Sequence, residues 1–202
     1  MSLMPHLEIT EGVFFPKNGM HDITNSIYQL GKDIGVQFHF RSPVEKIVTE
    51  GKRATGVIVD GTCIASDLVF SGTDVHFAHQ QLLEEKKLPA SVLQERSSSV
   101  VVFYWGINRK FPELDLHNMF YPDDYAAEFN GIFSTGKVID DASVYIHRSC
   151  EVVKADAPEG MENWFVMIMT PSDTQQVNDT VIAQIRRNTI AKLNKILSTD
   201  LE

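Results

Sequence analysis

The stretch MHDITNSIYQLGKDIGVQFHF, residues 20–40, contains both the helical and the strand periodicity that organise the first part of the chain. Its first apolar residues recur at intervals of three and four, which places them on one face of a helix: Met20, Ile23, Ile27, Leu30 and Ile34. Asn18 or Gly19 precedes this helix, and Gly35 stands where a left-handed C-terminal cap belongs. Val36, Phe38 and Phe40 then alternate with polar residues, as in a strand. The stretch therefore predicts a helix, a glycine turn and a short strand.

A β-meander is predicted next. Strands are expected at 44–48, 56–59 and 62–64, and Asp60-Gly61 between the last two is a strong hairpin signal because both residues tolerate positive φ. The short apolar segment 68–70 is expected to be a strand buried on both faces. Residues 1–76 thus form one predicted unit, a helix with a meander.

The predicted second unit, residues 77–202, is a mixed and largely antiparallel sheet with helices on one face. Asp74 is expected to cap a helix that reaches Leu83, and Asp123 or Asp124 to cap another. A short helical piece is expected from Pro89, and a long final helix at about 174–197. β-branched and aromatic residues predict the strands at 100–107, 118–121, 143–147 and 163–170. The fold class is α/β with α+β character.

Charge and composition exclude several classes of function. The chain has 202 residues and a net charge of −9, which disfavours a nucleic-acid surface because phosphate contacts need clustered cations. No segment approaches the roughly 18 to 20 apolar residues of a membrane span. Cys63 and Cys150 are expected to be reduced thiols, although the spacing leaves a disulfide open. His76 and His79 are three residues apart but have no third ligand, so no metal site is predicted.

No catalytic constellation is evident from the residues themselves. Asp123-Asp124 and Asp140-Asp141 are adjacent pairs, which do not face each other on a helix, so capping is the better interpretation. What stands out is the density of aromatic residues on predicted strands, which fits either a sheet core or the wall of a cavity for a long apolar ligand: Phe103, Tyr104, Trp105, Phe120, Tyr121, Trp164 and Phe165.

Several blocks, in the correct order, resemble the phytoene desaturases and their flavin amine oxidase relatives. They are GVFFPKNGM (12–20), SPVEKI (42–47), RATGV (53–57), SGTDVH (71–76), YWGI (104–107), HNMFY (117–121) and ENWFVMI (162–168). The likeness begins at about Leu7 and covers nearly the whole chain. Asn18 departs from it, because the family usually has glycine at that position.

The resemblance implies an FAD-dependent carotenoid desaturase, which introduces double bonds into a long apolar polyene. Residues 1–76 would be part of its FAD-binding domain and 77–202 part of its substrate domain. The implied cofactor-binding residues are Pro16, Asn18, Gly19, Met20, Val44, Ser71, Thr73 and Asp74. The implied substrate residues are Phe103, Trp105, Phe120, Tyr145 and Phe165. No catalytic base is indicated.

The resemblance also implies that the chain is a central portion of the enzyme. The glycine-rich dinucleotide-binding motif and the C-terminal flavin motif of the family are both absent, so we predict that the chain alone neither binds FAD tightly nor turns over. Cytoplasmic location with membrane-surface contact is expected of the full protein, and self-association of the isolated chain is expected too. A polyene isomerase or saturase, and a non-catalytic isoprenoid-binding escort protein, remain alternatives.

Overall fold

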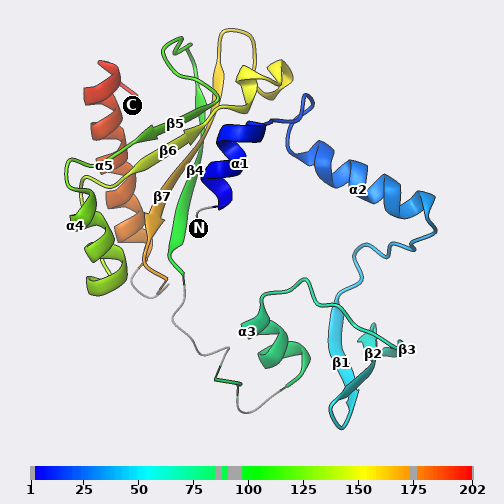
Figure 1. Cartoon of the computed structure of the whole chain (residues 1–202). Coiled ribbons are helices and arrows are strands. Elements are labelled where there is room, and N and C mark those ends of the chain that lie inside the picture. Colours follow the sequence, from blue (N-terminus) through cyan, green and yellow to red (C-terminus); the bar gives the residue numbers. More distant parts are fainter. Residues whose placement is uncertain (1–2, 85–87, 91–96, 173–176, 202) are drawn as a thin grey trace. The chain divides into compact units, whose positions relative to one another are not determined.

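The computed structural model describes residues 3–84, 88–90, 97–172 and 177–201. They form two units: residues 1–30 together with 97–202, and residues 31–96 (Figure 1). The mixture of helices with antiparallel sheets confirms the predicted fold class. The division into domains at residue 76 stays a prediction about the full protein.

The first unit is built on a four-stranded antiparallel sheet. Its strands are β4 (Ser99–Ile107), β5 (His117–Phe120), β6 (Val144–His147) and β7 (Glu162–Thr170), in the order β4-β7-β6-β5. β4 and β7 pair along their whole length, from Ser99 opposite Thr170 to Ile107 opposite Glu162. All four strands were predicted from their β-branched and aromatic content, to within one residue at each end.

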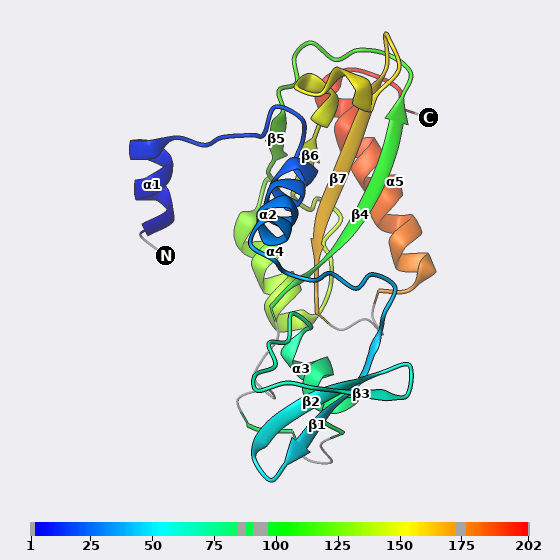
Figure 2. The same ribbon diagram turned by 90° about the vertical axis from the view of Figure 1, so that its right-hand side faces the viewer.

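Helix α5 (Asp179–Leu197) covers one face of this sheet (Figures 1 and 2). Residues of β7 are alternately buried and half-buried, which is the pattern of a sheet with one face in the core. Trp164, Val166 and Ile168 on that face share a hydrophobic core with Ile185 and Leu193 of α5. The helix begins at Asp179, because the Asn178 side chain caps it by accepting a bond from the Val181 amide, 3.1 Å away. The predicted start near Thr174 lies outside the described residues.

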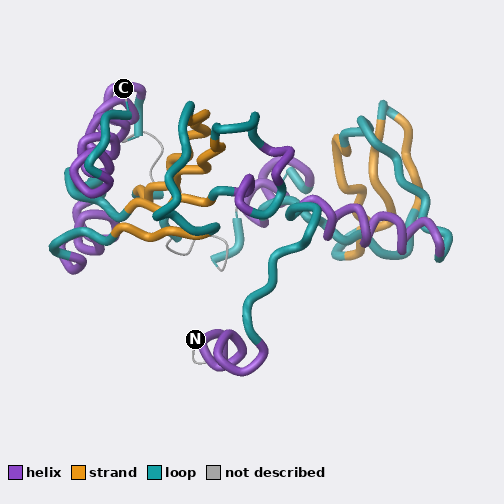
Figure 3. The backbone as a smooth tube through the Cα atoms, turned by 90° about the horizontal axis from the view of Figure 1, so that it is seen from above, coloured by secondary structure: helices purple, strands orange, loops and turns teal. Residues whose placement is uncertain are grey.

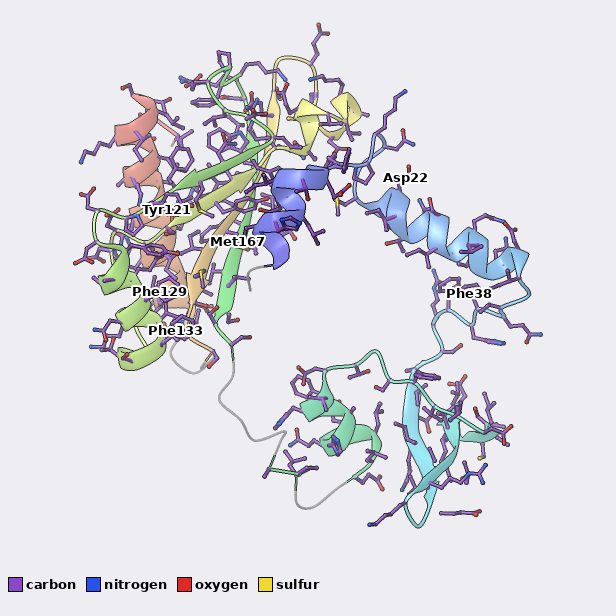
Figure 4. All side chains as sticks on the ribbon, in the orientation of Figure 1. Asp22, Phe38, Tyr121, Phe129, Phe133 and Met167 are labelled. Atoms are coloured by element: carbon purple, nitrogen blue, oxygen red, sulfur yellow. The ribbon has the colours of Figure 1, made fainter. Side chains whose placement is uncertain are left out.

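A row of aromatic rings runs along helix α4 (Tyr125–Asn130) and the π-helical turn η2 (Gly131–Thr135). Of the two predicted capping candidates, Asp123 and Asp124, it is Asp124 that caps α4, accepting a hydrogen bond of 2.9 Å from the Ala127 amide. Neighbouring rings have centroids 5.0 to 5.9 Å apart, and all four are exposed: Tyr121, Tyr125, Phe129 and Phe133. Figure 4 labels Tyr121, Phe129 and Phe133. We call these residues the aromatic ladder. The unit also contains helix α1 (Leu3–Glu11) and two short 3₁₀ turns, η3 (Ser149–Glu151) and η4 (Lys154–Asp156).

The predicted first helix is α2 (His21–Asp33). Gly35 adopts φ +89° and donates to the Lys32 carbonyl, and the Val36 amide donates to the Gly31 carbonyl at 2.8 Å, which together form the expected glycine cap. The strand predicted at 36–40 was wrong: this segment pairs with no strand among the described residues. Phe38 and Phe40 instead stack on each other with centroids 6.2 Å apart.

The second unit contains the predicted meander: β1 (Val44–Glu50), β2 (Arg53–Val59) and β3 (Thr62–Ala65), antiparallel in that order (Figure 3). Asp60 and Gly61 have φ of +48° and +69°, as the hairpin prediction required. The strand predicted at 68–70 was wrong, because Leu68 and Phe70 are 72% and 91% exposed and no described strand pairs with them.

Helix α3 (Val75–Phe77) and the π-helical turn η1 (Ala78–Leu82) confirm the helix predicted after Asp74. The helical piece expected from Pro89 lies mostly outside the described residues. Among the helices that the structure describes, none is long and apolar enough to cross a membrane.

Candidate cofactor and substrate site

The segment from Pro16 to Met20 forms a turn that leads into α2. The Gly19 amide donates to the Pro16 carbonyl at 2.9 Å, and Gly19 has φ +91°, a conformation that favours glycine. Asn18 does not adopt positive φ, and its amide nitrogen bonds the Asp22 carboxylate at 3.0 Å. The local backbone therefore does not require the family's glycine at position 18. A glycine turn at the N-terminus of a 13-residue helix suits a ligand that carries negative charge.

Val44 is the first residue of β1, which is an edge strand of the meander. It is 40% exposed and pairs with Val59 on its inner side. The outer side of an edge strand presents backbone N–H and C=O groups, which can bond the polar edge of a nucleobase. This placement is compatible with the cofactor-binding role that the resemblance implies for Val44.

Ser71, Thr73 and Asp74 form an exposed loop before α3. The Thr73 amide donates to the Ser71 hydroxyl at 3.3 Å. The Asp74 carboxylate accepts from the amides of His76 and Phe77, at 2.9 and 3.4 Å, so it caps the helix. The eight candidate cofactor residues are thus divided between the units: Pro16 to Met20 belong to the first, and Val44 with this loop belongs to the second.

The five candidate substrate residues lie on opposite faces of the four-stranded sheet. Phe103, Trp105 and Phe120 lie on the face covered by α5, where they pack against the hydrophobic core. Tyr145 and Phe165 alternate with buried residues of β6 and β7, so they lie on the other face. Part of the aromatic density therefore packs in the core of the sheet and part lies on a half-exposed surface, and a role of that surface in ligand binding stays a prediction.

We call this second surface the open face. By strand alternation and register it is formed by Val100, Val102, Tyr104, Phe165, Met167, Met169, Tyr145, His147, His117 and Met119. Tyr104 is 80% exposed and its ring meets Phe165 edge-on at 5.5 Å. Figure 4 marks Met167 on the sheet, in the strand next to Tyr145. Flexible methionines beside rings form a surface that adapts to an extended apolar ligand.

Three polar residues gather at the β5–β6 side of the open face. The His117 Nδ1 atom lies 2.8 Å from the Tyr145 hydroxyl, and the imidazoles of His117 and His147 stack with centroids 5.0 Å apart. The Phe15 ring packs against both, at 6.5 and 5.6 Å. We call His117, Tyr145 and His147 the polar cluster. Sequence reasoning missed its two histidines, since only the cross-strand pairing of residues 30 apart brings them together.

Burial governs the electrostatics of the polar cluster. It lowers the pKa of His147, His117 lowers that pKa further, and Asp156 opposes both. Burial also raises the pKa of Tyr145. The Nε2 atom of His147 is buried and has no hydrogen-bond partner among the described residues. The lowered pKa favours the neutral imidazole of His147 at neutral pH, and its Nε2 atom keeps hydrogen-bonding capacity that no described residue uses.

The remaining candidates carry no site. Cys63 is exposed and Cys150 is buried, and both are free thiols, so the structure contains no disulfide between them. In the part of the chain that the structure describes, no three His, Cys, Asp or Glu side chains converge as metal ligands would.

Comparison with known proteins finds similar sequences among curated desaturases. The chain is 40% identical over its whole length to a 1-hydroxycarotenoid 3,4-desaturase from Flavobacterium sp. (strain P99-3), of which it covers 42%. It is 33% identical over 84% of its length to a zeta-carotene-forming phytoene desaturase from Myxococcus xanthus, of which it covers 33%. The chain thus spans less than half the length of these curated relatives.

A solved structure supports the fold. An oxidoreductase from Methanosarcina mazei superposes with a TM-score of 0.56 at 16% identity, covering 91% of this chain and 40% of that one. The sequence profile described as flavin containing amine oxidoreductase matches residues 1–200, which is nearly the entire chain. This chain therefore belongs to the flavin containing amine oxidoreductase family.

Proposed function

We propose that the complete protein is an FAD-dependent carotenoid desaturase that converts C–C single bonds of a long polyene into double bonds. The observation that carries the proposal is the 40% identity, along the whole chain, to a 1-hydroxycarotenoid 3,4-desaturase. The second relative, a phytoene desaturase, supports the same class of substrate. Nothing in these likenesses supports the escort or isomerase alternatives.

The cofactor-binding residues of this chain would be Pro16, Asn18, Gly19 and Met20 at the start of α2, with Val44, Ser71, Thr73 and Asp74 in the second unit. Bound FAD would accept the two electrons that desaturation removes. The glycine turn and helix N-terminus would stabilise negative charge on the cofactor, and the β1 edge would bond its base.

The open face would hold the polyene. Tyr145 and Phe165 support this role by their position on the open face. Phe103, Trp105 and Phe120 lie on the opposite face, where they would support the sheet by packing against its core. Apolar and aromatic side chains exclude water from the reacting carbons and hold an extended chain in a defined orientation. The only chemistry required of these residues is to bind and orient the substrate, and none of them is proposed as a base.

We further propose that the full protein is cytoplasmic and contacts a membrane surface, because its substrate would dissolve in lipid. The exposed aromatic ladder supports such contact, since tyrosine and phenylalanine rings are favourable at the membrane interface. Self-association of the isolated chain also stays a prediction. The exposed apolar stripe of α2 supports it, and light scattering that shows only a monomer would contradict it.

The test is to purify the full-length protein, measure bound flavin from its visible absorption, and incubate it with carotenes and hydroxycarotenes. Stoichiometric flavin together with products that carry one additional double bond is the expected result. If the protein binds polyenes but contains no flavin and converts none of them, it would instead be assigned to the isoprenoid carriers.

A further inference from the structure

The open face is not uniformly apolar. Along β4 and β7 it presents valine, methionine, phenylalanine and one tyrosine, whereas on β5 and β6 it presents the polar cluster. The two regions adjoin directly, because His147 pairs with Phe165 and Tyr145 pairs with Met167 across the strands. A ligand extended over this face would therefore be apolar along its length and meet hydrogen-bonding groups at one end.

The polar cluster has hydrogen-bonding capacity that the described residues do not use. Nε2 of His147 is buried without a partner, and a buried polar atom in that state is unfavourable. A neutral imidazole nitrogen donates or accepts according to its tautomer, and a phenol does both. A ligand hydroxyl, which also does both, would satisfy the cluster whichever tautomer is present.

The Phe15 ring connects the cluster to the proposed cofactor site. It packs on the imidazoles of His117 and His147, and the next residue, Pro16, begins the turn that is proposed to bind the cofactor. A ligand end held by the cluster would thus lie close to a turn that is proposed to bind the cofactor.

We propose that His147, His117 and Tyr145 form a subsite for a hydroxyl at the end of an otherwise apolar polyene. The inference rests on the proposed function and deepens it by naming the substrate class as hydroxylated rather than purely hydrocarbon. The relative that matches the whole chain is named for a 1-hydroxycarotenoid and for desaturation at carbons 3 and 4. In such a substrate the carbon that bears the hydroxyl lies two bonds from the nearer reacting carbon, so groups that bind the hydroxyl would lie close to the flavin.

Two variants of the full-length flavoprotein test this subsite. Tyr145→Phe and His147→Phe each remove hydrogen-bonding atoms and keep a ring of similar size. Tyr28→Phe on α2 is the matched control, since it removes a tyrosine hydroxyl outside the cluster. The measured quantity is the ratio of kcat/KM for a hydroxylated polyene to kcat/KM for the same polyene without the hydroxyl. Losing one such hydrogen bond should lower this ratio about tenfold in the cluster variants.

The outcomes separate this inference from the proposed function. A ratio that falls in both cluster variants and stays constant in Tyr28→Phe supports the subsite. A ratio that does not change, or equal loss on both polyenes, overturns it. If the wild-type protein desaturates neither polyene, the proposed function fails. The subsite is then tested by binding alone, measured from polyene absorption in flavin-free protein. Equal affinity of the wild-type protein for both polyenes overturns the subsite.

Discussion

The Glu162 carboxylate is fully buried and accepts hydrogen bonds from three donors. The Phe111 amide lies 2.9 Å away, the Trp164 indole nitrogen 2.8 Å, and the Arg148 guanidinium 2.6 Å. The Arg148 side chain is 3% exposed, so this ion pair lies in the interior. Within such a pair each charge compensates the other, and removal of one partner leaves an unpaired buried charge.

Replacing Glu162 by glutamine keeps the side-chain volume and removes the negative charge. We expect the free energy of unfolding to fall by about 3 kcal/mol, the lower end of the usual loss for breaking a buried pair. The lower end applies because Arg148 retains its bond to the Leu114 carbonyl. Glu151→Gln is the matched control. Glu151 contacts the same guanidinium at 3.4 Å but is 44% exposed, so its loss should be under about 1 kcal/mol.

Urea denaturation followed by tryptophan fluorescence measures both variants, since Trp105 and Trp164 both lie in the four-stranded sheet. With an m-value of about 2 kcal/mol per molar urea, the Glu162→Gln midpoint should fall by roughly 1.5 M at unchanged slope. A loss no larger than that of Glu151→Gln would refute the reasoning. The double variant with Arg148→Met should recover more than about 1 kcal/mol, because the uncompensated cation is then removed.

Three further changes should alter stability in the same assay. Gly131→Ala places a methyl carbon 2.7 Å from a backbone carbonyl and should lose about 1–3 kcal/mol, whereas Gly106→Ala, in open space, should lose less than 1. Asp124→Ala removes the α4 cap and should lose about 1 kcal/mol; an unchanged midpoint would contradict the capping role. Burial lowers the pKa of His147 below 6.5, so the folded state favours the neutral imidazole. The stability that this neutral imidazole contributes is complete above pH 6.5 and is lost as the pH falls through the lowered pKa. His147→Phe should therefore flatten the decline in stability between about pH 7 and 5, and an unaltered decline would exclude His147 as its source.

Short sequence patterns correctly predicted those turns and caps that depend only on neighbouring residues. Gly35 and the Asp60-Gly61 pair were identified because positive φ is required there, and Asp124 because a carboxylate satisfies the free amides of a helix start. The strand predictions at 36–40 and 68–70 were wrong because strand formation depends on a distant partner. Apolar alternation reports which faces are covered, but a strand also needs a partner, and the described chain provides none there.

The candidate site was predictable only in part. Resemblance located the turn before α2 and the aromatic strands, but the residue pattern did not show which face of the sheet α5 covers. Phe103 and Phe165 are equally aromatic in sequence, and only the register of β4 with β7 places them on opposite faces. The polar cluster was missed because His117 and His147 meet through strand pairing, which periodicity does not specify.

The most direct test of the proposed desaturase is an anaerobic titration of the full-length flavoprotein with a hydroxylated polyene, recording the visible spectrum throughout. Flavin absorption should disappear in proportion to added substrate, while the polyene bands move to longer wavelength as one double bond is gained for each flavin reduced. An unchanged flavin spectrum, with the polyene bound but unaltered, would contradict the assignment of this chain to a carotenoid desaturase.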